Sequence, residues 1–186
     1  MDIKKGITFV AFGFLLTLVN FNLTINGFTV NIFPDFLGWI CIYLAFDKLG
    51  TYISDKKYMK WAAMILAVVS CAVWVIDTFM KTIDIKMVNY AVNLVAAVYM
   101  FILLGVVIKV ARDRGSARAD TINILRFINL FVFVILTVLS AVANRMSVDV
   151  LVPVVAIVGV IAIVAAIITA VTLFALKKDF DTATIE

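Results

Sequence analysis

Residues 150–176, VLVPVVAIVGVIAIVAAIITAVTLFAL, decide the fold of this chain, because no charged side chain interrupts them. A helix needs about 20 apolar residues to cross the hydrocarbon core of a bilayer. The stretch is longer than a perpendicular crossing requires, so we expect it to tilt or to project beyond the bilayer. It predicts a membrane-spanning helix.

The composition of the whole chain also indicates a membrane protein. Of its 186 residues, 65% are apolar and 15% are charged, whereas an ordinary soluble domain is about 45–50% apolar and about 25% charged. A soluble fold of this size has too little interior to hide so much apolar surface. The connections between apolar segments are short. We therefore expect a single transmembrane domain over residues 1–186.

Six apolar segments predict an all-α membrane fold, a bundle of six transmembrane helices. They cover residues 7–23, 34–49, 59–80, 87–111, 121–144 and 150–176. With the N-terminus inside, thirteen Lys and Arg residues lie on the cytoplasmic side, and only Lys81, Lys86 and Arg145 lie outside. Short cytoplasmic loops carry such an excess of cations. We expect a multipass plasma-membrane protein with both termini in the cytoplasm, and the net charge of +4 reflects this orientation rather than nucleic-acid binding.

The connection between the first two segments has a different pattern. Apolar and polar residues alternate over residues 21–25 and again over residues 28–32, with Asn26 and Gly27 between them. Alternation on both sides of Asn-Gly is typical of a β-hairpin with a type I′ turn, which requires positive φ at its central residues. We expect a small extracytoplasmic hairpin with its apolar face against the helices. The alternative is that the first helix continues through Ile25.

Few residues suited to enzyme chemistry occur in the chain. It has no histidine, and its only glutamate is Glu186. The commonest general base and the commonest metal ligand are therefore missing. Cys41 and Cys71 both lie inside apolar segments, where cysteine packs as a small apolar residue. We expect neither catalysis nor a metal or cofactor site.

Polar residues inside the spans are the candidate functional residues, because the bilayer makes them costly and they usually face protein or a cavity. On the fifth segment they recur at steps of three and four residues, which places them on one helix face. On the first segment Gly13, Thr17 and Asn20 do the same. The candidate binding residues are Asn20, Asp35, Asp77, Asn89, Asn93, Arg126, Asn129, Thr137, Ser140 and Asn144.

Two interpretations of these residues stay open. Most of the Asn and Asp residues fall in the outer half of the membrane, which favours a hydrated, outward-facing pocket. The alternative is adhesion between helices, where a polar contact contributes roughly 0.6–2 kcal/mol. Arg126 either extends to the headgroups or pairs with Asp47. Asp77 either lines the pocket or pairs with Lys81 on the surface.

The fifth segment carries the most specific expectation. Its polar stripe, with Asn129, Thr137 and Ser140, should face the protein interior, because hydrocarbon offers these side chains no hydrogen-bond partner. We expect Asn89 and Asn93 to approach this stripe. The face that we take as opposite should contact lipid, and it carries Leu125, Val132, Leu136 and Leu139.

Small residues recur along the sixth segment at helical spacing. They are Ala156, Gly159, Ala162, Ala166 and Ala170. Such stripes let two helix backbones approach closely. The helix that packs there is either another span of this chain or a second membrane protein.

The motif at residues 31–39, NIFPDFLGW, from Asn31 to Trp39, resembles a segment of an uncharacterised family of small multipass membrane proteins of Gram-positive bacteria. Pro34 suits the first turn of a helix, Asp35 lies at the positive end of its dipole, and Gly38 allows close packing. The resemblance covers about the first 50 residues and implies no particular activity.

The six-span layout is also similar to the substrate-binding subunits of energy-coupling-factor vitamin transporters. Those proteins have a comparable length, a cytoplasmic N-terminus and a first outer loop that caps an outer pocket. The first segment departs from them, since Phe and Leu largely replace their stripe of small residues.

The first functional hypothesis is a non-enzymatic membrane protein that binds or passes a small solute through an outer-facing polar pocket. The alternative is an accessory or structural subunit whose spans pack against a partner membrane protein. The partners implied are the lipid bilayer in both cases, a small-molecule ligand in the first, and a membrane protein on the sixth helix in the second.

Overall fold

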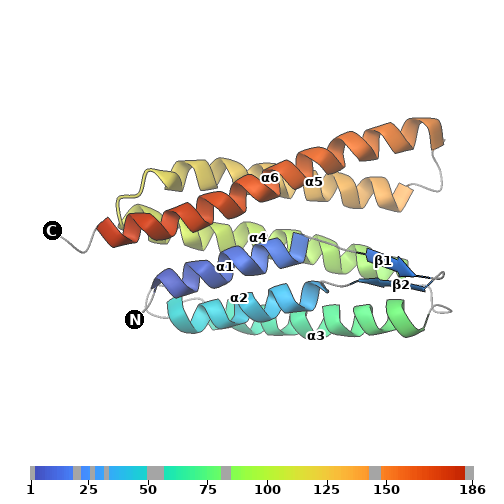
Figure 1. The fold of residues 1–186 in the computed structure, drawn as a ribbon, viewed down its shortest axis with the longest axis horizontal. Coiled ribbons are helices and arrows are strands. Elements are labelled where there is room, and N and C mark those ends of the chain that lie inside the picture. Colours follow the sequence, from blue (N-terminus) through green and yellow to red (C-terminus); the bar gives the residue numbers. More distant parts are fainter. Residues whose placement is uncertain are drawn as a thin grey trace. The chain divides into compact units, whose positions relative to one another are not determined.

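The computed structural model describes residues 3–18, 22–25, 28–31, 34–49, 57–80, 85–142 and 148–182. Six helices are present in these ranges, as predicted. The elements are α1 (Ile3–Leu18), β1 (Asn22–Ile25), β2 (Phe28–Asn31), α2 (Asp35–Leu49), α3 (Lys57–Phe79), α4 (Lys86–Asp113), α5 (Arg118–Val142) and α6 (Val148–Thr182) (Figure 1).

Four of the described helices are long and apolar enough to cross a membrane. The candidate spans are Lys57–Phe79, Met87–Asp113, Arg118–Val142 and Leu151–Phe180. Four of the six predicted spans therefore have the length and apolar composition of a membrane span. In α1 and α2, 16 and 15 residues are helical, which is short of the roughly 20 residues that a perpendicular crossing needs.

The segment between α1 and α2 contains the two short strands. They pair antiparallel, with Asn22 opposite Asn31 and Ile25 opposite Phe28. Asn26 and Gly27 lie outside the described residues, as do the side chains of both strands. The positive φ expected at Gly27 and the packing of an apolar face on the helices therefore stay predictions.

The chain divides into two compact units. Unit 1 comprises Met1–Ile85 and Ala170–Glu186, and unit 2 comprises Lys86–Thr169. The boundary falls within α6, so the first part of this helix belongs to unit 2 and the last part to unit 1. The single domain expected over residues 1–186 stays a prediction.

Unit 1 is built around a close crossing of α1 and α2. A Cβ atom added to Gly38 would lie 2.7 Å from the carbonyl oxygen of Gly13 and 2.5 Å from Cγ2 of Thr17. The backbones of the two helices therefore nearly touch, and the close packing predicted at Gly38 is confirmed. Gly13 and Thr17, which the sequence grouped in a polar stripe, serve here as packing surface.

Two further contacts complete the helical part of unit 1. Lys60 of α3 forms an ion pair with Asp47 of α2 and lies 4.6 Å from the centre of the Tyr43 ring. The last part of α6 reaches α1 through an edge-to-face contact between Phe174 and Phe12, whose ring centres are 5.2 Å apart. These contacts are lateral, between side chains on neighbouring helices.

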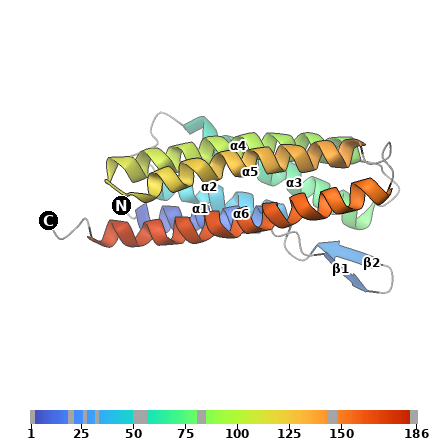
Figure 2. The ribbon, with the colours of Figure 1, turned by 90° about the horizontal axis from the view of Figure 1, so that it is seen from above.

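Unit 2 contains an antiparallel pair of helices, α4 and α5, which lie side by side along their length in Figures 1 and 2. The turn between them has Gly115 at a φ of 66°. The Gly115 N–H donates to the carbonyl of Arg112, and the Ser116 N–H donates to the carbonyl of Ala111. This is a Schellman motif, which ends helices at a residue with positive φ.

Candidate functional site

The predicted site residues are distributed over both units. Asn20 and Asn144 lie outside the described residues. Asp35 and Asp77 belong to unit 1, and the remaining six candidates belong to unit 2. Within unit 2, Arg126 and Asn129 lie one turn apart on α5, where Arg126 contacts α4 and Asn129 contacts α6. These residues and their contacts are called the unit 2 cluster below.

Arg126 lies against α4. Its guanidinium carbon is 4.5 Å from the centre of the Phe101 ring and 5.0 Å from the centre of the Phe127 ring. A Cβ atom added to Gly105 would lie 2.6 Å from Nη1 of Arg126, so the guanidinium occupies space that the missing side chain of Gly105 leaves open. The Nε atom is buried and has no hydrogen-bond partner.

These contacts determine the depth of the guanidinium. Arg112 and Asp120 form an ion pair of 3.0 Å near the α4–α5 turn. Gly105 lies seven residues before Arg112, or roughly 10 Å along the helix at 1.5 Å per residue. The guanidinium is therefore held about two turns inside the helix pair. Asp47, the partner considered for it, is paired with Lys60.

Asn129 connects α5 to α6. Its amide nitrogen donates 2.8 Å hydrogen bonds to the Thr169 hydroxyl and to the Leu125 carbonyl. The Thr169 hydroxyl in turn donates to the Ala165 carbonyl at 2.7 Å. Both side chains are buried, at 6% and 0% exposure. The Asn129 side-chain oxygen is buried without a hydrogen-bond donor.

The rest of the α5 stripe bonds within the protein or faces outward. The Thr137 hydroxyl donates to the Phe133 carbonyl one turn back, at 2.9 Å. Ser140 is exposed, and its carbonyl accepts a 3.0 Å hydrogen bond from the Tyr90 hydroxyl of α4. Asn93 is exposed and Asn89 is half-buried. Tyr90 of α4 thus forms a hydrogen bond with the stripe.

The expected lipid face of α5 needs correction. Leu125 and Val132 are buried, at 6% and 8% exposure. They lie four residues before and three residues after Asn129, so helical spacing places them beside Asn129 and not opposite to it. The exposed face carries Ile124, Phe131, Ile135 and Val138.

The carboxylates of unit 1 have separate surroundings. Asp77 is exposed near the end of α3, and its expected partner Lys81 lies outside the described residues. Asp35 is half-buried at the start of α2, and its Oδ1 has no hydrogen-bond partner. The positive end of the α2 dipole favours a negative charge at this position.

Comparisons of the chain with protein-family models, curated proteins and solved structures found no match. The resemblances noted from the sequence therefore stay hypotheses. The function is best argued from the chemistry of the helices themselves.

In the unit 2 cluster, the cost of placing Arg126 inside a membrane helix is similar in size to the gains from its cation–π contacts and from the hydrogen bond between helices. An arginine near the centre of a membrane helix costs about 2.5–3.5 kcal/mol on insertion scales. A cation–π contact returns about 0.5–2 kcal/mol, and a hydrogen bond between spans about 0.6–1.7 kcal/mol. Cation–π contacts with two rings therefore offset much of the cost of the charge, while the buried Nε of Arg126 keeps no hydrogen-bond partner.

Three members of this cluster were missed by sequence reasoning: Phe101, Gly105 and Thr169. Thr169 could have been found, because Thr169 and Thr172 are the only polar residues in the last apolar segment. Phe101 and Gly105 lie four residues apart on α4 and so share a face. Their role depends on the side of α4 that faces α5, which the sequence pattern does not reveal.

Proposed function

We propose that this chain is a non-catalytic membrane protein whose internal polar residues join its helices and whose sixth helix packs against a partner membrane protein. We thus prefer the accessory or structural subunit, which was the alternative in the sequence analysis, to a protein with an outer-facing pocket. The observation that carries the proposal is the open small-residue face on the first part of α6.

The small residues of α6 fall into two groups. Ala166 and Ala170 are buried, at 7% and 2% exposure. Ala156 is exposed, and a Cβ atom added to Gly159 would meet no atom within 4 Å. Glycine costs about 1 kcal/mol relative to alanine inside a helix. Packing contacts offset that cost where small residues let another helix approach closely. This favours a protein partner over lipid at this face.

The packing of α6 agrees with this reading. In the described part of the chain, the closely packed helix pairs are α1–α2, α2–α3 and α4–α5, and α6 is not among them. Large apolar side chains flank Gly159 and are exposed, including Ile157 at 62% and Val160 at 60%. On α5, the Asn129 amide donates to the Thr169 hydroxyl of α6, as expected of a residue that joins two helices.

Gly159→Leu should abolish partner binding and leave the chain itself folded. The substitution fills open space in this structure but blocks the close approach of another helix. Native mass spectrometry of the protein, extracted gently from its host membrane, should show a defined complex with a second membrane protein for the wild type only. Ile161→Leu is the matched control, because Ile161 is exposed and lies two residues after Gly159, on nearly the opposite side of the helix. The same complex in both variants would exclude this face as the interface.

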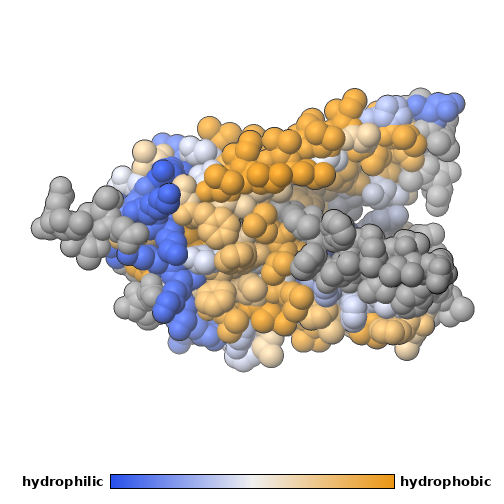
Figure 3. Space-filling view, viewed as in Figure 1, coloured by the Kyte–Doolittle hydropathy of each residue, from blue (hydrophilic) through white to orange (hydrophobic). Residues whose placement is uncertain are grey.

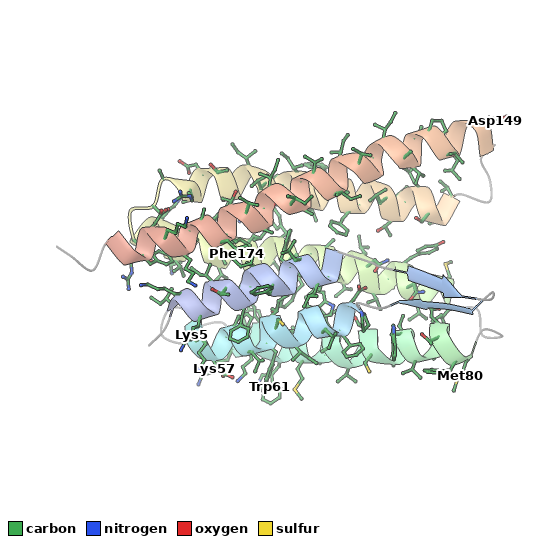
Figure 4. The ribbon with its side chains drawn as sticks, viewed as in Figure 1. Lys5, Lys57, Trp61, Met80, Asp149 and Phe174 are labelled. Carbon is green, nitrogen blue, oxygen red and sulfur yellow. The ribbon has the colours of Figure 1, made fainter. Side chains whose placement is uncertain are left out.

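The proposed topology has six spans with both termini in the cytoplasm. In unit 1, α1 and α3 begin at the end where α2 and the chain's last helix finish, and hydrophilic side chains gather there (Figure 3). Figure 4 shows Lys5 and Lys57 at that end and Met80 at the opposite end of α3. The exposed Tyr58 and Trp61 adjoin Lys57, which suits an aromatic belt at a membrane interface. α1 and α2 complete the six as a short, closely packed pair.

Cysteine labelling tests this topology. In a background lacking Cys41 and Cys71, single cysteines at Thr29 and Lys57 should react differently with an impermeant thiol reagent on intact cells. We expect labelling at position 29 only, with both positions labelled after the cells are opened. Labelling at position 57 alone would mean that the orientation is reversed.

Binding of a small solute is the second candidate function. The favouring observation is the pair of unpartnered buried atoms on one face of α5, Nε of Arg126 and Oδ1 of Asn129. Arg126 lies about two turns and Asn129 about three turns from the start of α5. In the proposed topology this candidate site therefore reaches from the cytoplasmic half to the middle of the membrane and is not in the outer half. It does not depend on a partner at α6.

A further inference from the structure

The Arg126 guanidinium lacks a carboxylate partner among the described residues. The acidic residues of unit 2 are Asp113, Asp120 and Asp149, and each lies at a helix end. Asp120 forms an ion pair with Arg112 near the turn. Stacking on Phe101 and Phe127 orients the guanidinium but supplies no acceptor to its N–H groups.

The geometry allows the Arg126 guanidinium to bind an anionic group from outside the chain. Arg126 is half-buried, so part of its side chain is accessible from outside unit 2. Its position is fixed by Gly105 and by the two rings, whose centres lie 4.5 and 5.0 Å from the guanidinium carbon. A planar guanidinium held in this way binds phosphate or carboxylate oxygens through paired N–H groups.

Asn129 adds a second requirement for the ligand, namely a hydrogen-bond donor. Its amide nitrogen is occupied by Leu125 and Thr169, so the side chain cannot turn over without losing two hydrogen bonds. The oxygen therefore stays available as an acceptor. Arg126 and Asn129 are three residues apart and share a helix face. A ligand that satisfies both carries an anionic oxygen group beside a hydroxyl donor.

We propose that Arg126 and Asn129 form a binding site for an anion that also bears a hydroxyl group. The proposal rests on the second candidate function, solute binding, and not on the α6 interface. Two sources have this chemistry: an inner-leaflet lipid such as phosphatidylglycerol, and a small soluble anion such as hydrogen phosphate. Both approach from the cytoplasmic side in the proposed topology.

The test uses the full chain purified in a neutral detergent. Phosphatidylglycerol and inorganic phosphate are titrated separately, and binding is followed by the thermal unfolding midpoint and by native mass spectrometry. We expect saturable binding of one probe and an affinity at least tenfold lower in Arg126→Gln. Arg112→Gln is the matched control, because Arg112 is exposed and already paired with Asp120. Its affinity should equal that of the wild type.

Arg126→Met provides a second variant that should remain folded. It removes the charge and keeps an unbranched apolar side chain against the two rings. Probe binding should be lost while the unfolding midpoint without probe holds or rises. A lowered midpoint with unchanged probe affinity would contradict the proposal, because binding would then not depend on the guanidinium.

The two probes separate the sources and the hypotheses. Binding of phosphatidylglycerol but not phosphatidylcholine or phosphate identifies a lipid ligand, and binding of phosphate identifies a soluble one. Equal affinity in the wild type and Arg126→Gln, or no saturable binding of either probe, would overturn the anion site. If a neutral polar molecule were then retained in the native mass spectra, solute binding would still be supported. If the spectra showed no bound molecule, both the anion site and the solute-binding function would be excluded.

Discussion

Replacing Gly38 with leucine should leave little folded protein, because it inserts a side chain where two helix backbones meet. The Cβ atom alone would lie 2.7 Å from the Gly13 carbonyl oxygen and 2.9 Å from the Thr17 nitrogen. These are backbone atoms and cannot move aside as a flexible side chain can. Overpacking typically costs 1–3 kcal/mol and occasionally more, and we expect about 3 kcal/mol or more here. The measurement is the thermal unfolding midpoint of the purified protein in detergent.

Gly159→Leu is the matched control for this experiment. It makes the same chemical change in a membrane helix, but nothing lies within 4 Å of the added Cβ atom. Its midpoint should match that of the wild type or exceed it, because leucine is the better helix former. Gly38→Ala should fall between the two leucine variants. Equal midpoints for Gly38→Leu and Gly159→Leu would show that α1 and α2 do not cross at Gly38.

The helices could be predicted from the sequence because the bilayer imposes a simple rule. Residues 150–176 form a helix since every backbone N–H and C=O must find a partner within its own segment. The close packing at Gly38 could also be predicted, since a glycine just inside a membrane helix lets a second helix approach closely. The bounds of α2, Asp35–Leu49, lie within one residue of the predicted segment. Those of α1 were harder to predict, because the helix begins at Ile3 and because β1 takes residues that the apolar segment alone assigned to helix.

The surroundings of Arg126 and Asn129 could not be predicted with equal success. The polar stripe on α5 was visible, but the side of the helix that faces protein depends on its rotation against α4 and α6. Asn129, Leu125 and Val132 share the buried face, and helical spacing alone would have allowed this to be seen. The positions of Phe101 and Gly105 beside the guanidinium arise from the pairing of α4 with α5. That pairing is a tertiary contact without a local sequence signal.

The motif at residues 31–39 poses a separate question, namely whether it is structural or functional. Trp39 is its largest side chain and is only 2% exposed, on the α2 face that also buries Ile42 and Phe46. The neighbouring Ile40 is 42% exposed. If the motif builds the fold, its contribution should depend on burial and not on side-chain chemistry.

Trp39→Ala should therefore destabilise the protein strongly, and Ile40→Ala should not. Truncating a buried tryptophan typically costs 3–5 kcal/mol. We expect about 3 kcal/mol, because a helix in lipid loses packing contacts rather than burial from water. Ile40→Ala should stay within about 0.5 kcal/mol. Midpoints measured in the same detergent give the comparison. Unchanged stability in Trp39→Ala, together with loss of a bound ligand or partner in native mass spectra, would instead make Trp39 a recognition residue and the motif a functional one.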